Sequence, residues 1–117
     1  MAALALLAGV AWLSRDALRL GLAFSAAESR PALLRDARWD EEASARLFGR
    51  RFRSGVASAE LLSWLNENRF DVDRAAARAS RRIAALPCNE RVEVRWAADK
   101  DGRLTRASAL VHEAGCL

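Results

Sequence analysis

Three residues toward the C-terminus have side chains that could do chemistry: Cys88, His112 and Cys116. Two cysteines can form a disulfide, a cysteine and a histidine can act as a nucleophile and its base, and all three side chains can bind a metal. The chain has no other cysteine and no other histidine. Each of these chemistries therefore depends on how the chain positions these three residues.

The two cysteines bracket a stretch that is predicted to form a β-hairpin. In "RVEVRW", Val92, Val94 and Trp96 alternate with charged residues, which is the period-two pattern of a half-buried strand. "AADKDGR" contains turn-forming residues, and "LTRASALVH" predicts a returning strand. An antiparallel hairpin brings Cys88 and Cys116 together, so a disulfide is favoured over two free thiols. It would close a loop of about 28 residues, and such loops stabilise a fold by roughly 3 to 4 kcal/mol.

The metal and nucleophile interpretations are weaker. A structural zinc site needs four ligands, and the chain offers only the two cysteines and His112 as typical zinc ligands. A Cys116 nucleophile with His112 as base has no orienting third group or oxyanion donors in view. Gly-rich phosphate loops and zinc-protease motifs do not occur in the sequence. We therefore predict a protein that is not an enzyme, with no cofactor, no metal site and no small-molecule substrate.

Residues 1–27 are predicted to be a signal peptide or a membrane anchor. The run "AALALLAGVAWLS" is uncharged and largely apolar, but as a helix it would reach only about 20 Å, short of the roughly 30 Å hydrocarbon core. A signal could be cleaved before Ala26 or before Glu28, an anchor would continue through "LRLGLAFSAA", and a buried core helix is the remaining alternative. The arginines after the run count against export, because positive charge favours the cytoplasmic side.

The fold class predicted for the whole chain is α+β: an N-terminal apolar helix, then two or three short helices packed on a small antiparallel β-sheet. Residues 28–39 are predicted to be a linker or a short helix, and residues 40–117 a small domain. "DEEASARLFGRRFRSG" predicts a helix with Asp40 as its N-cap and an end at Gly55. "VASAELLSWLNENRF" predicts a second helix, after which Phe70 folds back onto the last turn.

The segment "DVDRAAARASRRIAAL" favours a helix over residues 74–86, because alanine favours helices and apolar residues recur at helical spacing before Pro87; a strand is the alternative. The other side of this helix would carry a basic ridge, a candidate contact for phosphates or lipid headgroups, formed by Arg74, Arg78, Arg81 and Arg82. A solvated face is the favoured interpretation. The ridge has no interleaved aromatic residue to stack a base, so nucleic-acid binding is only weakly supported.

The overall charge gives little further support for a polyanion partner. The net charge is +4, but Lys100 is the sole lysine and the acidic residues are interspersed among the arginines, which indicates a composition bias. Two tryptophans with arginines nearby in the sequence, Trp64 and Trp96, are candidate anchors for a protein partner, because Trp and Arg dominate interface energetics. Ordinary core packing of both tryptophans is the alternative.

The phrases "RFRSGVASAELLSWLNENRF", "VEVRW", "DKDGRL" and the terminal "CL" resemble the SmpA/OmlA outer-membrane assembly lipoproteins, whose fold is related to that of the beta-lactamase inhibitor protein. The resemblance covers roughly residues 40–117. It implies two helices packed on an antiparallel sheet and a non-catalytic, protein-binding module of the bacterial envelope. No lipobox cysteine follows the apolar run, because both cysteines lie far downstream.

The function predicted from these features is a membrane-tethered or secreted envelope protein that binds an envelope protein partner. It would be anchored in the inner membrane through residues 1–27 and face the periplasm, or be secreted. A disulfide supports this compartment, since disulfides persist where the environment is oxidising. The alternative is a cytoplasmic basic protein that binds nucleic acid through the arginine-lined helix 74–86.

Overall fold

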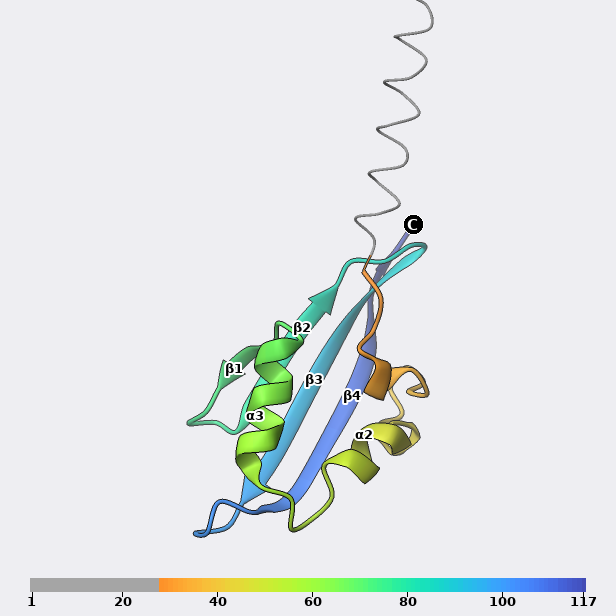
Figure 1. Ribbon diagram of the computed structural model, residues 1–117. Helices are drawn as coiled ribbons and strands as arrows, with labels where there is room; N and C mark the ends of the chain where they lie inside the picture. The colour runs from red at the N-terminus through yellow and green to blue at the C-terminus, as the bar shows by residue number, and fades with distance from the viewer. Residues whose placement is uncertain (1–27) are drawn as a thin grey trace, which may run out of the picture.

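The computed structural model describes residues 28–117 and gives them an α+β fold (Figure 1). Four strands form one antiparallel sheet in chain order: β1 (Asp71–Asp73), β2 (Arg78–Ile83), β3 (Cys88–Ala98) and β4 (Leu104–Cys116). Short helices precede the sheet: the 3-10 helices η1 (Ala32–Leu34) and η2 (Glu42–Ser44), and the α-helices α2 (Arg46–Arg51) and α3 (Ser58–Glu67). The prediction of short helices and a small antiparallel sheet is confirmed. The apolar helix predicted within residues 1–27 lies outside the described residues.

The alternation along β3 gives the sheet two different faces. Val92 and Val94 are fully buried on the side of the helices, which we call the inner face. Arg91 and Arg95 are exposed on the opposite side, which we call the outer face. In Figure 1, α2 and α3 both lie in front of the sheet, on its inner face. The predicted hairpin of β3 and β4 is confirmed, and Val92 stands directly opposite Val111.

An aromatic cluster joins the helices on the inner face. The Trp64 ring of α3 lies 5.5 Å from Phe48, 5.6 Å from Phe52 and 5.4 Å from Phe70, measured between ring centroids. The backbone N–H of Phe70 donates to the carbonyl of Leu65 at 3.0 Å, so the chain folds back onto the end of α3 as predicted. Tilted and edge-to-face aromatic contacts of this kind add about 0.5 to 1.5 kcal/mol each beyond burial.

The prediction of a helix over residues 74–86 is wrong. This segment is a turn followed by strand β2, in which Ala79 stands opposite Val94 and Ile83 opposite Glu90. The Asp73 carboxylate accepts a hydrogen bond from the backbone N–H of Ala76 at 3.1 Å and thereby closes the turn. Pairing with strands on both sides outweighs the helix propensity of alanine, which is only a weak preference.

The helix predicted to begin at Asp40 is shorter than expected. Asp40 has a φ of 58°, and its N–H donates to the carbonyl of Val111 at 2.9 Å, which places it beside the edge of β4. The helix α2 begins only at Arg46. Its N-cap residue, Ala45, has no side chain that could cap the helix, and Asp36 Oδ2 instead accepts hydrogen bonds from the backbone N–H groups of Arg46 and Leu47, each at 3.1 Å.

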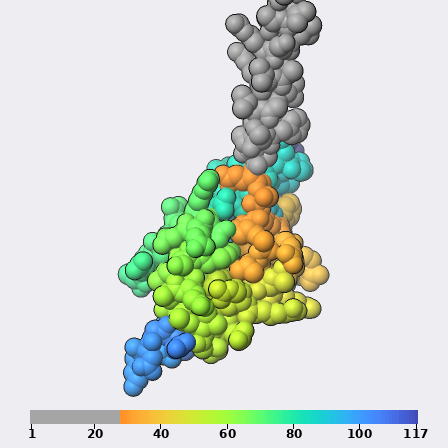
Figure 2. All heavy atoms as spheres, viewed as in Figure 1, coloured from red at the N-terminus to blue at the C-terminus, as the bar shows by residue number. Residues whose placement is uncertain are grey.

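Residues 28–39, predicted to be a linker or short helix, contain η1 and pack against the domain. Leu34 is fully buried and Ala37 nearly so, both in the same core as the helices. Figure 2 shows the helix side of the molecule, where this segment, α2 and α3 form one continuous surface over the sheet. No helix within residues 28–117 is long and apolar enough to cross a membrane.

Candidate functional site

The two cysteines form a disulfide. Cys88 and Cys116 are register partners at the end of the β3–β4 hairpin, and their sulfur atoms are 2.07 Å apart. The prediction of this pair is confirmed, and Cys116 therefore has no free thiol that could act as a nucleophile or a metal ligand. Among residues 28–117, no group of three or more His, Cys, Asp and Glu side chains is arranged to hold a metal ion.

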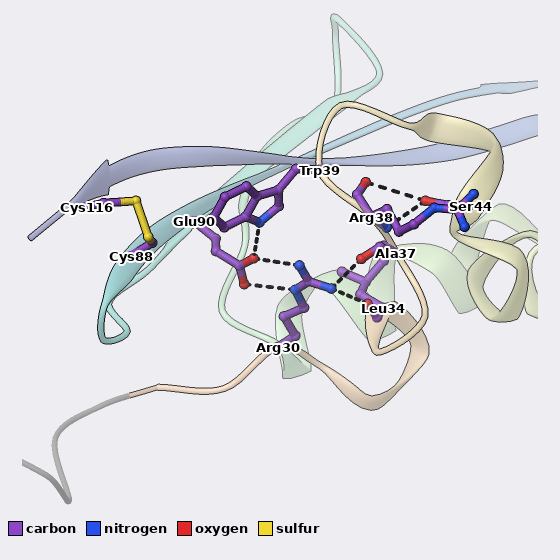
Figure 3. Close-up of polar contacts among 9 residues, drawn as sticks. All are labelled: Arg30, Leu34, Ala37, Arg38, Trp39, Ser44, Cys88, Glu90 and Cys116. Carbon is purple, nitrogen blue, oxygen red and sulfur yellow. Dashed lines mark hydrogen bonds and ion pairs between the residues drawn. A yellow bond between two sulfur atoms is a disulfide. The ribbon is translucent and has the colours of Figure 1, made fainter.

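Beside the disulfide, a buried ion pair joins the segment before η1 to β3 (Figure 3). The Arg30 guanidinium donates to both carboxylate oxygens of Glu90, at 2.8 and 2.6 Å, and also to the carbonyls of Leu34 and Ala37. The indole N–H of Trp39 donates to the same carboxylate at 2.5 Å. Bidentate charge-assisted bonds are among the strongest that side chains make. We call Arg30, Trp39 and Glu90 the clamp.

The clamp is a structural site rather than a reactive one. Hydrogen bonds from Arg30, and less so from Trp39, lower the pKa of Glu90, although burial opposes this shift. The same hydrogen bond raises the pKa of Arg30. Both groups are therefore charged at neutral pH, and the polar atoms of the pair are engaged with one another. The clamp fastens the start of the described chain to the end of the sheet that carries the disulfide.

His112 lies on the outer face of β4, between two carboxylates. Its Nδ1 is 2.7 Å from Asp40 Oδ1, and its Nε2 is 3.5 Å from Glu93 Oε2. The hydrogen bond to Asp40 raises the pKa of His112, burial opposes this shift, and Glu93 adds to it. This arrangement pins the loop at Asp40 to the edge of the sheet.

The outer face carries two cross-strand pairs of arginines. Arg78 of β2 stands directly opposite Arg95 of β3, and Arg82 stands directly opposite Arg91. All four side chains are exposed and share one face, because they lie an even number of residues apart along their strands. We call these four residues the arginine pairs. Like charges directly opposite each other destabilise a sheet, by a fraction of a kcal/mol to about 1 kcal/mol.

Acidic neighbours do not neutralise the arginine pairs. Asp73 is the register partner of Arg78, but one of its carboxylate oxygens accepts from the N–H of Ala76 and it makes no ion pair with Arg78. Glu93 lies between the pairs; of the four arginines it reaches only Arg91, at a long 3.8 Å, and its other oxygen is 3.5 Å from His112 Nε2. Within residues 28–117, Arg78, Arg82 and Arg95 make no ion pair. The outer face therefore presents guanidinium groups whose donors are directed to solvent.

Two shallow hollows lie on this face and touch all four arginines. One, of about 300 Å³, is lined by Arg78, Arg91 and Arg95, and the other, of about 290 Å³, by Arg82 and Arg91. Ser80 of β2 lines both hollows. The face is therefore indented rather than flat, and the Ser80 hydroxyl lies between the two arginine pairs.

The structure separates the four arginines predicted to form one ridge. Arg78 and Arg82 lie on the outer face, whereas Arg74 lies in the turn between β1 and β2. Arg81 points to the other side, where it donates to the Asn68 carbonyl at 2.8 Å and pairs with Glu28 at 3.0 Å. Residues 74–86 therefore do not form the arginine-lined helix that was predicted as a nucleic-acid contact.

The two tryptophans predicted to anchor a partner are packed in the domain. Trp96 has 8% of its surface exposed, on the inner face, and Trp64 is half-buried among the phenylalanines. Both tryptophans therefore lie where the core-packing alternative places them. Trp39, which the sequence did not single out, is 42% exposed and belongs to the clamp.

Sequence reasoning missed Arg91 and Arg95 as site residues. Their alternation with Val92 and Val94 had already assigned them to the face away from the core. Their partners could not be found while residues 74–86 were expected to be helical, because only strand pairing places Arg82 and Arg78 opposite them.

Comparison with known proteins finds no matching family model, curated protein or solved structure.

Proposed function

We propose that this protein is a non-catalytic binding module of the bacterial envelope, tethered or secreted, which binds another protein through the outer face of its sheet. The observation that carries the proposal is the arrangement of the arginine pairs. Like charges stand opposite one another at two places on an exposed sheet, and three of the four arginines make no ion pair within residues 28–117. Such an arrangement costs stability and gains nothing within the domain, so an anionic partner is its simplest use.

The chemistry of the domain supports a binding role over a catalytic one. Cys116 is in the disulfide, His112 is engaged with Asp40, and Glu90 is engaged with Arg30. Arg78, Arg82 and Arg95 of the outer face are instead exposed and make no ion pair within residues 28–117, so their donors are accessible to a partner. Guanidinium groups bind carboxylates in bidentate geometry and suit recognition better than acid–base catalysis at neutral pH.

Two features support the proposed compartment: the disulfide and the apolar N-terminal run. A disulfide is compatible with an oxidising location, and the run at residues 2–14 supplies a route to it as a signal or an anchor. The likeness to the SmpA/OmlA proteins points the same way.

Site-specific photo-crosslinking in bacterial cells that produce the full chain tests this function. A photoreactive amino acid replaces either Ser108, which stands next to Arg95 on the outer face, or Ser63 on the exposed side of α3. We expect a discrete, protease-sensitive adduct from position 108 that is absent from position 63. Equal adducts at both positions, or none at position 108, would contradict the proposal.

A further inference from the structure

The arginine pairs are separated by a fixed distance along the sheet. Arg78 and Arg82 are four residues apart on β2, as are Arg91 and Arg95 on β3. At a rise of about 3.3 Å per residue, the two pairs lie about 13 Å apart along the strands. Each pair offers two guanidinium groups that can hold one carboxylate between them by charge-assisted hydrogen bonds.

The row between the pairs has the opposite character. Ser80 stands directly opposite Glu93 there, and Asp71 of β1 stands opposite Ser80. Two carboxylates in this row repel an acid and accept hydrogen bonds from a hydroxyl or an ammonium group. The outer face therefore alternates along the strands from positive to negative and back to positive.

From this alternation we infer that the outer face binds an extended acidic segment of its protein partner, with carboxylates at positions i and i+4 and a non-acidic residue at i+2. In an extended chain these three side chains point to one side, and positions i and i+4 are about 13 Å apart. The end carboxylates meet the arginine pairs, and the middle residue meets Ser80 and Glu93. This inference rests on the proposed function and names the partner's chemistry.

The spacing disfavours other forms of acidic partner. Carboxylates at i and i+4 of an α-helix are only about 6 Å apart along its axis, so a helical segment would need a different pattern, with acids seven or eight residues apart, to reach both pairs. An anionic membrane surface or a nucleic acid also supplies negative charge. Neither places a non-acidic group between two acids, which the Ser80–Glu93 row requires of its partner. The excess of arginine over acid on this face also speeds the encounter with an acidic segment, in a salt-dependent way.

Two peptides of equal length, composition and net charge test the inference by fluorescence anisotropy on the full chain in an uncharged detergent. One has Glu at i and i+4 with Ser at i+2, and the other has Glu at i and i+2 with Ser at i+4, in the same Thr- and Val-rich background. We expect the first to bind about tenfold more tightly, the equivalent of one charge-assisted contact. Equal affinities would overturn the inference.

Matched charge variants show whether position or net charge decides the affinity. Arg95→Gln removes one member of a pair, whereas Arg106→Gln removes an exposed arginine of the same face that stands opposite Ala97. We expect R95Q to lower the affinity for the first peptide about tenfold and R106Q to lower it less than twofold. An equal loss in both variants would mean simple charge attraction and would overturn the inference.

A single-stranded oligonucleotide and vesicles containing an anionic phospholipid are the competing occupants. If either displaces the first peptide and loses affinity in R95Q but not in R106Q, the outer face is a nucleic-acid or membrane site and the inference is wrong. The crosslinking result separates the two proposals. A protein adduct at position 108 without the peptide preference leaves the proposed function standing, whereas loss of the adduct removes both.

Discussion

Arginine has a structural role in one region of this molecule and a proposed binding role in another. In the clamp, Arg30 is largely buried and donates to the Glu90 carboxylate and two backbone carbonyls. On the outer face, Arg95 is exposed, stands opposite another arginine and makes no ion pair within residues 28–117. The same side chain is satisfied in one place and unsatisfied in the other. The contacts that an arginine makes, and not its presence alone, therefore distinguish a structural role from a binding role.

The two regions also depend on the same scaffold. β3 contributes Glu90 to the clamp on its inner face and Arg91 and Arg95 to the outer face. The disulfide fixes β3 to β4 next to the clamp. Changes that break the scaffold should affect both regions, whereas changes to single arginines should separate them.

Removing the disulfide should have the largest effect. Replacing both cysteines with serine (Cys88→Ser, Cys116→Ser) opens a loop of 28 residues, and we expect a loss of roughly 3 to 4 kcal/mol in the free energy of unfolding. Urea unfolding with and without reductant measures this loss. Reductant should weaken the wild-type protein and leave the double variant unchanged; an equal response of the two proteins would contradict the prediction.

Breaking the clamp should have the next largest effect. Arg30→Ala leaves the Glu90 carboxylate without its main partner in a largely buried site, and we expect a loss of about 3 kcal/mol in unfolding free energy. Arg38→Ala is the matched control, because Arg38 pairs with Glu41 in a largely exposed site and should matter by less than about 0.5 kcal/mol. Similar losses in the two variants would show that burial and hydrogen bonding do not distinguish them.

Acidification should weaken the clamp in a defined pH range. The folded-state pKa of Glu90 is lowered below its ordinary value of 4.5, so its contribution to stability is complete above pH 4.5 and is lost as the pH falls through the folded-state pKa. Unfolding free energies measured from pH 7 downward should therefore drop below pH 4.5, and Glu90→Gln should flatten this part of the profile. An unchanged slope in the variant would assign the acid sensitivity to other carboxylates.

Alkaline pH should act on the outer face instead. The pKa of His112 is raised above 6.5 by Asp40, so its contribution is complete below pH 6.5 and is lost as the pH rises through the folded-state pKa. The effect should be small, because the ion pair is largely exposed. Histidine titration followed by NMR should give a pKa above the ordinary value in the wild-type protein and a lower one in Asp40→Asn. Identical pKa values would contradict the assigned cause.

The sequence predicted the hairpin and the disulfide because both depend on local alternation and on the distance along the chain. It predicted the wrong structure for residues 74–86 because Ala79 and Ile83 are four residues apart, a spacing that suits one face of a helix and one face of a strand equally. Only pairing with β3, which depends on residues distant in the sequence, decides between the two.

The same ambiguity limited the prediction of the site. Arg78 and Arg82 were singled out, but together with Arg81, which the strand turns to the opposite face. The clamp could not be predicted at all, because Arg30 and Glu90 are 60 residues apart and nothing in their local patterns links them. Sequence patterns therefore identified two of the four arginine pair residues, Arg78 and Arg82, and not the strand register that places Arg95 and Arg91 opposite them.

Stability and binding measured in the same variant, Arg95→Gln, test whether the outer face is a binding surface. We predict that its unfolding free energy stays within about 0.5 kcal/mol of wild type, or rises slightly as like-charge repulsion is relieved, while crosslinking from position 108 falls severalfold. A loss of stability greater than about 1 kcal/mol would make Arg95 a structural residue like Arg30. Unchanged crosslinking would show that the outer face is not the binding surface.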